Sequence, residues 1–324
     1  MQKFVPLRCV DIHTDHCPCL LAETNHCFMC SHLQGKEVCD CNWTGQCLLY
    51  EKIWQSVKQK NLRREVESAV HIVRYIPPST YLLDLRVDAI MGQQLSRLGS
   101  FVFIRALDDP EICSFPVGIM DISHDPDTDS DTLHVAIETV GPKSSRIFLK
   151  DQAKISVRGP YYNGIFGQPW IESMKHGKIF LLAGGIGQAC SIMIVRTLIA
   201  SGNDVTAVIA PGKVGALFVA DRLKKMGCTV LTVSSMRDQG FGIVAEAAAN
   251  REVDLVVSAG PDTMHHGLID HLGEIGLTLP MAVTNNTKMC CGEGICGSCV
   301  QKTKDGQWVR TCKAQLDYRQ LELS

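Results

Sequence analysis

Sixteen cysteines constrain this chain more than any other feature of its sequence, because they are gathered in two dense groups. Eight lie before residue 48 and five lie between residues 290 and 312. A secreted protein would pair such cysteines as disulfides, but the N-terminus, MQKFVPLRCVDIHTDHC, lacks the unbroken apolar core of a signal peptide. We therefore expect a cytoplasmic protein whose cysteines bind metal.

The C-terminal group has the spacing C-x4-C-x2-C-x12-C. Three thiolates on one tight loop and a distant fourth are typical of a plant-ferredoxin-type [2Fe–2S] cluster. The predicted ligands are Cys291, Cys296, Cys299 and Cys312. Gly292, Gly294 and Gly297 let the loop curl and turn backbone N–H groups toward anionic sulfides. Zinc is the alternative, but zinc sites usually use paired C-x2-C spacings, and we expect Cys290 to be a buried thiol.

The N-terminal group follows no standard metal-binding spacing. Its cysteines are Cys9, Cys17, Cys19, Cys27, Cys30, Cys39, Cys41 and Cys47. Eight thiols divide into two four-ligand sites, and C-x-C and C-x2-C pairs place thiolates close enough to share a metal. We expect one or two further iron–sulfur clusters of the [4Fe–4S] type here, with structural zinc as the alternative.

Hydrophobic patterns divide the chain into five regions. Residues 1–47 form the cysteine-rich module, which needs metal because it is too small to build an apolar core. Residues 48–66 carry apolar residues at helical spacing, which predicts a linker helix. Residues 67–160 contain short alternating segments separated by Pro, Asp, Gly and Ser, which predict an antiparallel β-barrel. Residues 176–284 alternate strand and helix patterns, which predict a doubly wound parallel α/β sheet, and residues 285–324 carry the [2Fe–2S] segment.

A glycine-rich turn follows the first strand of the α/β region. Gly184, Gly185 and Gly187 stand between the apolar strand KIFLLA and a helix-like stretch. Such glycines let the backbone approach a pyrophosphate, and the helix N-terminus that follows supplies positive potential. Taken alone, the turn fits plain strand-to-helix packing as well as nucleotide binding.

Four motifs in this order resemble the ferredoxin-reductase superfamily. They are GPYYNGIFG (159–167), LLAGGIGQA (181–189), SAGPDTM (258–264) and the cysteine motif (291–312). The arrangement is similar to the electron-transfer subunits of dihydroorotate dehydrogenase and to the small subunits of NADH-dependent ferredoxin:NADP oxidoreductase, with the N-terminal module as an addition. The resemblance implies FAD on the barrel, NAD(P) as a substrate on the α/β domain, and a cluster that passes electrons to a partner subunit.

The resemblance also implies cofactor-binding residues. Those for NAD(P) are Gly184, Gly185 and Gly187 at the pyrophosphate and Gly260, Pro261 and Asp262 on the nicotinamide side. Those for the FAD pyrophosphate are Lys143, Ser144 and Ser145. The chain departs from the superfamily in two places. The flavin-contacting Arg-Pro-x-Ser strand is here Ser114–Gly118, which keeps only the proline, and Ala259 stands where a cysteine is usual.

Together these features predict an electron-transfer subunit of a multi-subunit NAD(P)H-linked iron–sulfur flavoprotein oxidoreductase. It would relay electrons between nicotinamide nucleotide, FAD and iron–sulfur clusters to partner subunits, with ferredoxin as one candidate partner. One alternative is an electron-wire or scaffold subunit that has lost its own flavin or nicotinamide site, and another is a zinc-binding regulatory protein.

Other functions lack support in the sequence. A net charge of −2 gives no general attraction to nucleic acid or to membranes, and no apolar run reaches the ~20 residues of a membrane span. We find no nucleophile–base arrangement, so we expect no complete substrate site in this chain. The neighbouring His265 and His266 are expected on the surface.

Overall fold

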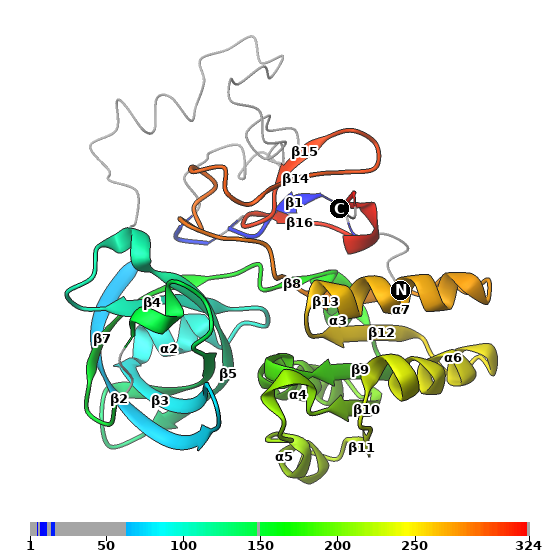
Figure 1. The fold of residues 1–324 in the computed structure, drawn as a ribbon, viewed down its shortest axis with the longest axis horizontal. Helices are drawn as coiled ribbons and strands as arrows, with labels where there is room; N and C mark the ends of the chain where they lie inside the picture. Colours follow the sequence, from blue (N-terminus) through cyan, green and yellow to red (C-terminus); the bar gives the residue numbers. More distant parts are fainter. Residues whose placement is uncertain (1–4, 6, 12–13, 17–62, 148–149, 323–324) are drawn as a thin grey trace.

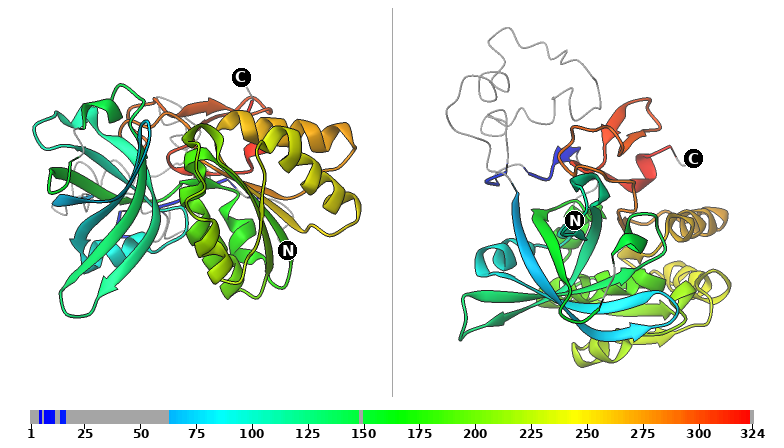
Figure 2. Two further views of the ribbon diagram at one scale, coloured as in Figure 1. Left: turned by 60° about the horizontal axis from the view of Figure 1, so that its bottom comes forward. Right: turned by 60° about the vertical axis from the view of Figure 1, so that its left-hand side comes forward.

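The computed structural model describes residues 5, 7–11, 14–16, 63–147 and 150–322. In this part of the chain a β-barrel and a helix-flanked sheet lie side by side (Figure 1). The C-terminal segment lies beside one end of both units in every view (Figures 1 and 2).

Six antiparallel strands close into the barrel that the sequence predicts. They are β2 (Arg64–Ile76), β3 (Thr80–Asp88), β4 (Phe101–Ala106), β5 (Phe115–Asp125), β6 (Ser130–Glu138) and β7 (Lys154–Tyr161). The order around the barrel is β2-β3-β6-β5-β4-β7. In β3 the buried Leu83, Leu85 and Val87 alternate with polar residues, as a strand with one buried face requires. Helix α2 (Ala89–Leu95) begins at Asp88, whose carboxylate accepts the Met91 N–H, and packs against β3, β5, β6 and β7.

Strand–helix alternation produces the second unit, a six-stranded sheet. Its strands are β8 (Ile165–Phe166), β9 (Lys178–Gly184), β10 (Asp204–Ala210), β11 (Thr229–Thr232), β12 (Leu255–Ala259) and β13 (Met281–Thr284). Its helices are α3 (Gln168–Ser173), α4 (Ser191–Ala200), α5 (Ala220–Lys225), α6 (Phe241–Ala249) and α7 (Asp262–Glu274). The order is β11-β10-β9-β12-β13-β8, and of these six strands only β8 runs antiparallel to its neighbour. The predicted fold class is confirmed, with a mixed rather than a wholly parallel sheet.

Helices cover both faces of this sheet because successive side chains of a strand point in opposite directions. Leu181 of β9 packs in one core cluster with Val195 of α4. The next residue, Leu182, packs in another cluster with Val244 of α6 and Leu268 of α7. The carboxyl ends of the parallel strands meet at one edge, where the glycine-rich turn follows β9.

Short helical turns connect these elements. The 3-10 turns are η3 (Glu111–Cys113), η4 (Ser144–Arg146), η5 (Gly185–Cys190), η6 (Gly212–Val214) and η8 (Tyr318–Gln320), and η7 (Met236–Gly240) is a π-helical turn. The glycine-rich turn therefore runs into the 3-10 turn η5, which contains Gly185 and Gly187, before α4 begins.

The C-terminal segment has two small sheets. β14 (Val300–Lys302) and β15 (Trp308–Arg310) form a hairpin. β16 (Ala314–Gln315) pairs with β1 (Arg8–Cys9), which comes from the opposite end of the chain. Two chain ends that are about 300 residues apart in sequence are thus held together by backbone hydrogen bonds.

The structural units lie close to the predicted regions. The barrel strands run from Arg64 to Tyr161, against the predicted 67–160, so residues 64–66 pair with β7 and are not part of a linker helix. The parallel strands run from Lys178 to Thr284, within the predicted 176–284. Within the described part of the chain, none of the helices has the length and apolar character needed to cross a bilayer.

Candidate functional site

The cysteine loop follows β13 and curls through three glycines. Gly292, Gly294 and Gly297 have φ values of +67°, +72° and +76°, in the left-handed region that other residues rarely adopt. The Glu293 N–H donates to Cys291 Sγ at 3.2 Å. The loop therefore curls where the sequence predicts, and at least one backbone N–H points at a predicted ligand.

The four predicted ligand thiols lie as two pairs. Cys299 and Cys312 are both 2% exposed and hydrogen-bond each other, and Cys291 and Cys296 form the second pair. The Cys312 hydrogen bond lowers the pKa of Cys299 to about 6, and the same bond raises the pKa of Cys312. The charge of Cys291 also raises the pKa of Cys312, so the two pairs share one electrostatic neighbourhood.

This donor set suits an iron–sulfur cluster in kind, since three thiols come from one glycine-rich loop and the fourth from the turn between β15 and β16. Among the described residues, no three His, Cys, Asp or Glu side chains are gathered closely enough to hold a single metal ion. The ligand assignment therefore rests on the cysteine spacing, the loop conformation and the two pairs. Cys290, the spare cysteine, is half-buried and not fully buried as expected.

The loop lies on an aromatic cluster at the end of the barrel. Phe101 and Phe103 of β4 and Tyr161 of β7 have ring centroids 4.9 to 5.9 Å apart. They form one buried cluster with Cys299 and Cys312. A Cβ added to Gly292 would lie 2.7 Å from the rings of Phe103 and Tyr161, so only glycine permits this close approach. Tyr161 thus packs the barrel end under the loop.

Most of the N-terminal cysteine module lies outside the described residues. Cys9 is the described member of the group, and it is buried in β1 opposite Ala314. The other seven predicted ligands, Cys17, Cys19, Cys27, Cys30, Cys39, Cys41 and Cys47, fall in the range 17–62 that is not described. The metal sites of this module stay predictions.

The glycines of the predicted nucleotide turn make close backbone contacts. Gly185 has φ +58°. A Cβ on Gly187 would lie 2.3 Å from the carbonyl oxygen of Ala259 and 2.7 Å from the Gly260 nitrogen. A Cβ on Gly184 would meet Met264 Sδ at 3.2 Å. The turn and the end of β12 are therefore pressed together, which brings the predicted pyrophosphate and nicotinamide residues to one edge of the sheet.

Asp262 and Pro261 begin α7 at this same edge. Asp262 accepts hydrogen bonds from the Tyr318 hydroxyl at 3.3 Å and from Asn286 Nδ2 at 3.2 Å. The Tyr318 hydroxyl also lies 2.5 Å from His266 Nε2, and the two rings stack. The C-terminal segment thus holds the beginning of α7, a role for Tyr318 that no short motif in the sequence signals.

The prediction that His265 lies on the surface is wrong. His265 is fully buried, its Nδ1 lies 2.8 Å from Ser258 Oγ, and its Nε2 lies 3.2 Å from the Thr284 carbonyl oxygen. Burial lowers the pKa of His265 to about 4. Adjacent positions on a helix point about 100° apart, so His266 reaches the Tyr318 side while His265 turns into the core between β12 and β13.

A neutral buried histidine makes stability depend on pH. Below the ordinary histidine pKa of about 6.5, His265 binds a proton in the unfolded chain. In the folded chain it stays neutral down to about pH 4. Stability is therefore expected to fall as pH drops through this window, by up to about 1.4 kcal/mol per pH unit. Urea unfolding between pH 4.5 and 7.5 gives the free energy of unfolding at each pH. For His265→Gln this free energy should change less steeply with pH than for wild type. The exposed His71→Gln is the control. Equal slopes for wild type and His265→Gln would contradict this assignment.

The turn predicted to bind the FAD pyrophosphate lies against the strand that departs from the superfamily. Lys143 Nζ donates to the Ser114 carbonyl oxygen at 2.9 Å, and no carboxylate pairs with it among the described residues. Ser144 is buried, and its hydroxyl accepts the Gly141 N–H at 3.0 Å. Ser145 is exposed. The structure therefore brings Lys143 and the first residue of the 114–118 stretch together.

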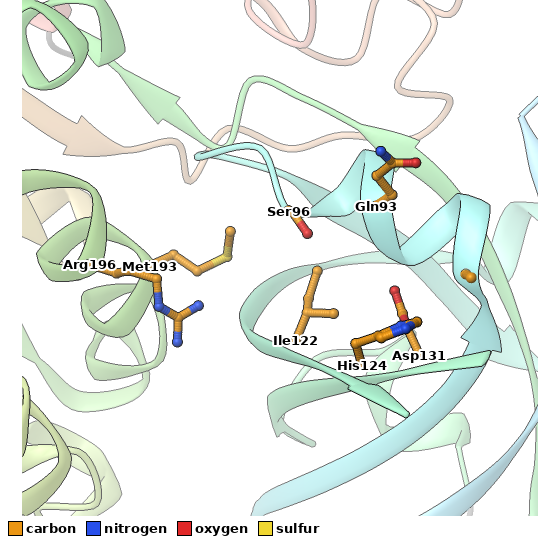
Figure 3. Close-up of a pocket in the computed structure, with 8 residues that line it drawn as sticks. Gln93, Ser96, Ile122, His124, Asp131, Met193 and Arg196 are labelled. Carbon is orange, nitrogen blue, oxygen red and sulfur yellow. The ribbon is translucent and has the colours of Figure 1, made fainter. Parts of the chain in front are cut away.

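A pocket of about 380 Å³ lies between the barrel and α4. Asp131 and His124 from the β5–β6 hairpin lie 2.6 Å apart on one side, and Met193 and Arg196 of α4 lie on the other (Figure 3). Arg196 also pairs with the buried carboxylate of Asp121. None of the residues that line this pocket belongs to residues 285–324, so the pocket is separate from the cysteine loop.

Comparison with known proteins agrees with this architecture, although no family model matches the chain. The dihydroorotate dehydrogenase B (NAD(+)) electron transfer subunit homolog of Thermotoga maritima is 24% identical over 254 residues, which cover 76% of this chain and 85% of that protein. The dihydroorotate dehydrogenase B electron transfer subunit of Clostridium acetobutylicum is 27% identical over 231 residues, 69% of this chain and 85% of that protein.

Among solved structures, a chain of the NADH-dependent reduced ferredoxin–NADP oxidoreductase matches with a TM-score of 0.63 and 21% identity, over 79% of this chain and 90% of that one. A ferredoxin reductase of carbazole 1,9a-dioxygenase matches with a TM-score of 0.51 over 68% of this chain. The resemblance drawn from the motifs is confirmed: the chain has a ferredoxin-reductase-like fold, and its curated relatives are electron transfer subunits of dihydroorotate dehydrogenase B.

Proposed function

We propose that this chain is an electron-transfer subunit of a multi-subunit NAD(P)H-linked iron–sulfur flavoprotein oxidoreductase. The observation that carries the proposal is the cysteine loop, whose buried Cys299 and Cys312 pack on the aromatic end of a ferredoxin-reductase-like barrel. Flavin, when bound, exchanges two electrons with a nicotinamide and single electrons with a [2Fe–2S] cluster. In this proposal the barrel binds the flavin, the sheet binds the nicotinamide nucleotide and the cysteine loop binds the cluster, all within one chain.

The residues at each site have separate tasks in this proposal. Cys291, Cys296, Cys299 and Cys312 hold the [2Fe–2S] cluster. Lys143 offers a half-buried cation that pairs with no carboxylate of the described residues, which suits the FAD pyrophosphate. The backbone of Gly184, Gly185 and Gly187 accommodates the NAD(P) pyrophosphate, with Gly260, Pro261 and Asp262 on the nicotinamide side. The N-terminal cysteines extend the path with one or two further clusters.

The tip of the cysteine loop is open to a partner. Cys296 is exposed, and its neighbour Ile295 is 71% exposed. An apolar side chain beside an exposed ligand suits a partner that approaches the cluster closely. Other subunits of an oxidoreductase complex are therefore the proposed electron donor or acceptor, with ferredoxin as a further candidate.

A second candidate is a wire or scaffold subunit without its own flavin, and one contact favours it. A Cβ added to Gly118, in the stretch aligned with the flavin-contacting strand, would lie 3.5 Å from Cys190 Sγ of η5. Barrel residues Ile76 and Leu82 also pack in one apolar cluster with Ala189 of η5. The barrel and η5 thus pack against each other beside Ser114–Gly118, the stretch that keeps only the proline of the flavin-contacting motif.

Cofactor analysis of the anaerobically isolated complex tests both candidates. We expect about two irons and two sulfides for the C-terminal site, more iron for the N-terminal module, and near-stoichiometric FAD. Adding NADH or NADPH should then bleach the flavin and reduce the cluster. Iron and sulfide without FAD would support the wire subunit, and zinc without sulfide would contradict both.

A further inference from the structure

Two cations and two carboxylates are buried together where β1, the barrel and the cysteine loop meet. Arg63 donates through Nη2 to Asp11 Oδ2 at 2.7 Å and through Nε to Glu293 Oε1 at 2.9 Å. Lys313 Nζ lies 2.5 Å from Asp11 Oδ2 and 3.2 Å from Glu293 Oε2. Arg63 Nη1 donates to the Pro160 carbonyl oxygen at 2.7 Å. Each carboxylate thus contacts both cations, and we call these four side chains the charge network.

The charge network is shielded from water. The side chains of Arg63 and Asp11 are 3% and 2% exposed, and those of Lys313 and Glu293 are 9% and 17% exposed. Burial alone would raise the pKa of Asp11, but the charges of Lys313 and Arg63 outweigh it and hold that pKa below its usual range. The fields of these side chains therefore act largely through protein rather than through water.

The charge network touches the cysteine loop at both ends of the ligand set. Lys313 directly follows Cys312, and Glu293 lies two residues after Cys291. The Arg63 guanidinium also stacks 4.8 Å above the ring of Tyr161, one of the aromatic residues on which the loop lies. A change in this network therefore acts on the ligands without altering a thiol.

We propose that the charge network positions the cysteine loop on the barrel and sets the reduction potential of the cluster, with Lys313 and Asp11 acting in opposite directions. The inference rests on the proposed [2Fe–2S] site. Reduction adds one electron to the cluster, so a nearby positive charge stabilises the reduced form and a nearby negative charge opposes it. β1 carries Asp11 into this position by pairing with β16. The N-terminal end of the chain is thereby made part of the cluster's surroundings.

The test is an EPR-monitored redox titration of the anaerobic complex. Lys313→Met should lower the midpoint potential by about 59 mV, a tenfold change in the one-electron equilibrium constant. Asp11→Asn should raise the potential, and the double variant should return toward wild type because the charge balance is restored. Lys302→Met, in an exposed pair with Glu322 on the same segment, is the matched control and should shift little. Shifts of the same sign for Lys313→Met and Asp11→Asn, or no shift in either, would overturn the proposal.

Iron and sulfide content is measured before each titration, which separates this inference from the function on which it rests. A wild-type complex without [2Fe–2S] contradicts the proposed function, whereas a cluster with unmoved potentials contradicts only the inference. If Lys313→Met fails to hold the cluster, Lys313→Arg and the double variant are expected to hold it, because both keep the charges balanced. Cluster loss in Lys313→Arg as well would contradict a role based on charge.

Discussion

A Cys299→Ser variant is expected to lose the C-terminal [2Fe–2S] cluster. Cys299 is 2% exposed, hydrogen-bonds Cys312 and packs on the aromatic end of the barrel, so its side chain is held in place inside the protein. A serine hydroxyl does not ionise near neutral pH and is a poor ligand for iron in a sulfide cluster. The expected loss of cluster exceeds about tenfold, since changes beyond the ligand shell alone cost 10–100-fold in metal affinity.

Cys290→Ser is the matched control for this experiment. Cys290 adjoins the first predicted ligand, is half-buried and lies outside the C-x4-C-x2-C spacing. Its variant should keep wild-type iron, sulfide and EPR signal from the [2Fe–2S] site. The ligand assignment would be wrong if Cys299→Ser kept the cluster, or if Cys290→Ser lost it to the same extent.

A Gly187→Ala variant is expected to lose both stability and nucleotide binding. The new Cβ would lie 2.3 Å from the Ala259 carbonyl oxygen and 2.7 Å from the Gly260 nitrogen. Both atoms belong to the backbone at the end of β12, so they cannot rotate away as a side chain would. Overpacking of this kind costs about 1–3 kcal/mol. It also separates the glycine-rich turn from residues 260–262, which are together proposed to hold NAD(P).

Gly242→Ala provides the control, since Gly242 lies inside α6 and a Cβ there meets nothing within 4 Å. That substitution should raise the free energy of unfolding by about 0.5–1 kcal/mol, because alanine loses less backbone entropy in a helix. Urea unfolding and NADH and NADPH titrations measure both effects. Unchanged stability in Gly187→Ala would contradict the tight packing of the turn. Unchanged nucleotide affinity would contradict the proposed binding site.

The sequence predicted the parts of this fold that depend on local patterns. Alternating segments became β2 to β7 because a strand with one buried face requires a period of two, as Leu83 and Leu85 illustrate. The glycines of the cysteine loop lie at positive φ because the tight curl between ligands excludes a Cβ. The 291–312 spacing likewise indicated a ligand set, and two of its members, Cys299 and Cys312, are buried at one end of the barrel.

Such local patterns could not predict contacts between distant segments of the chain. His265 reads as a surface residue beside His266, yet the sheet places it under Ser258 and Thr284, where burial decides its protonation. The edge strand β8 pairs with β13 in the antiparallel sense, a long-range contact between residues 165–166 and 283–284 that no local pattern signals.

The charge network shows most clearly the difference between what local patterns predict and what long-range contacts decide. Asp11 and Lys313 are 302 residues apart, and each reads in the sequence as an ordinary solvated charge. They meet because β1 pairs with β16, and in this arrangement Arg63 and Glu293 complete the ion pairs around them. The sequence by itself thus determined the repeated elements and the candidate ligands. The tertiary structure decided which charges surround those ligands, because burial and long-range pairing depend on the whole chain.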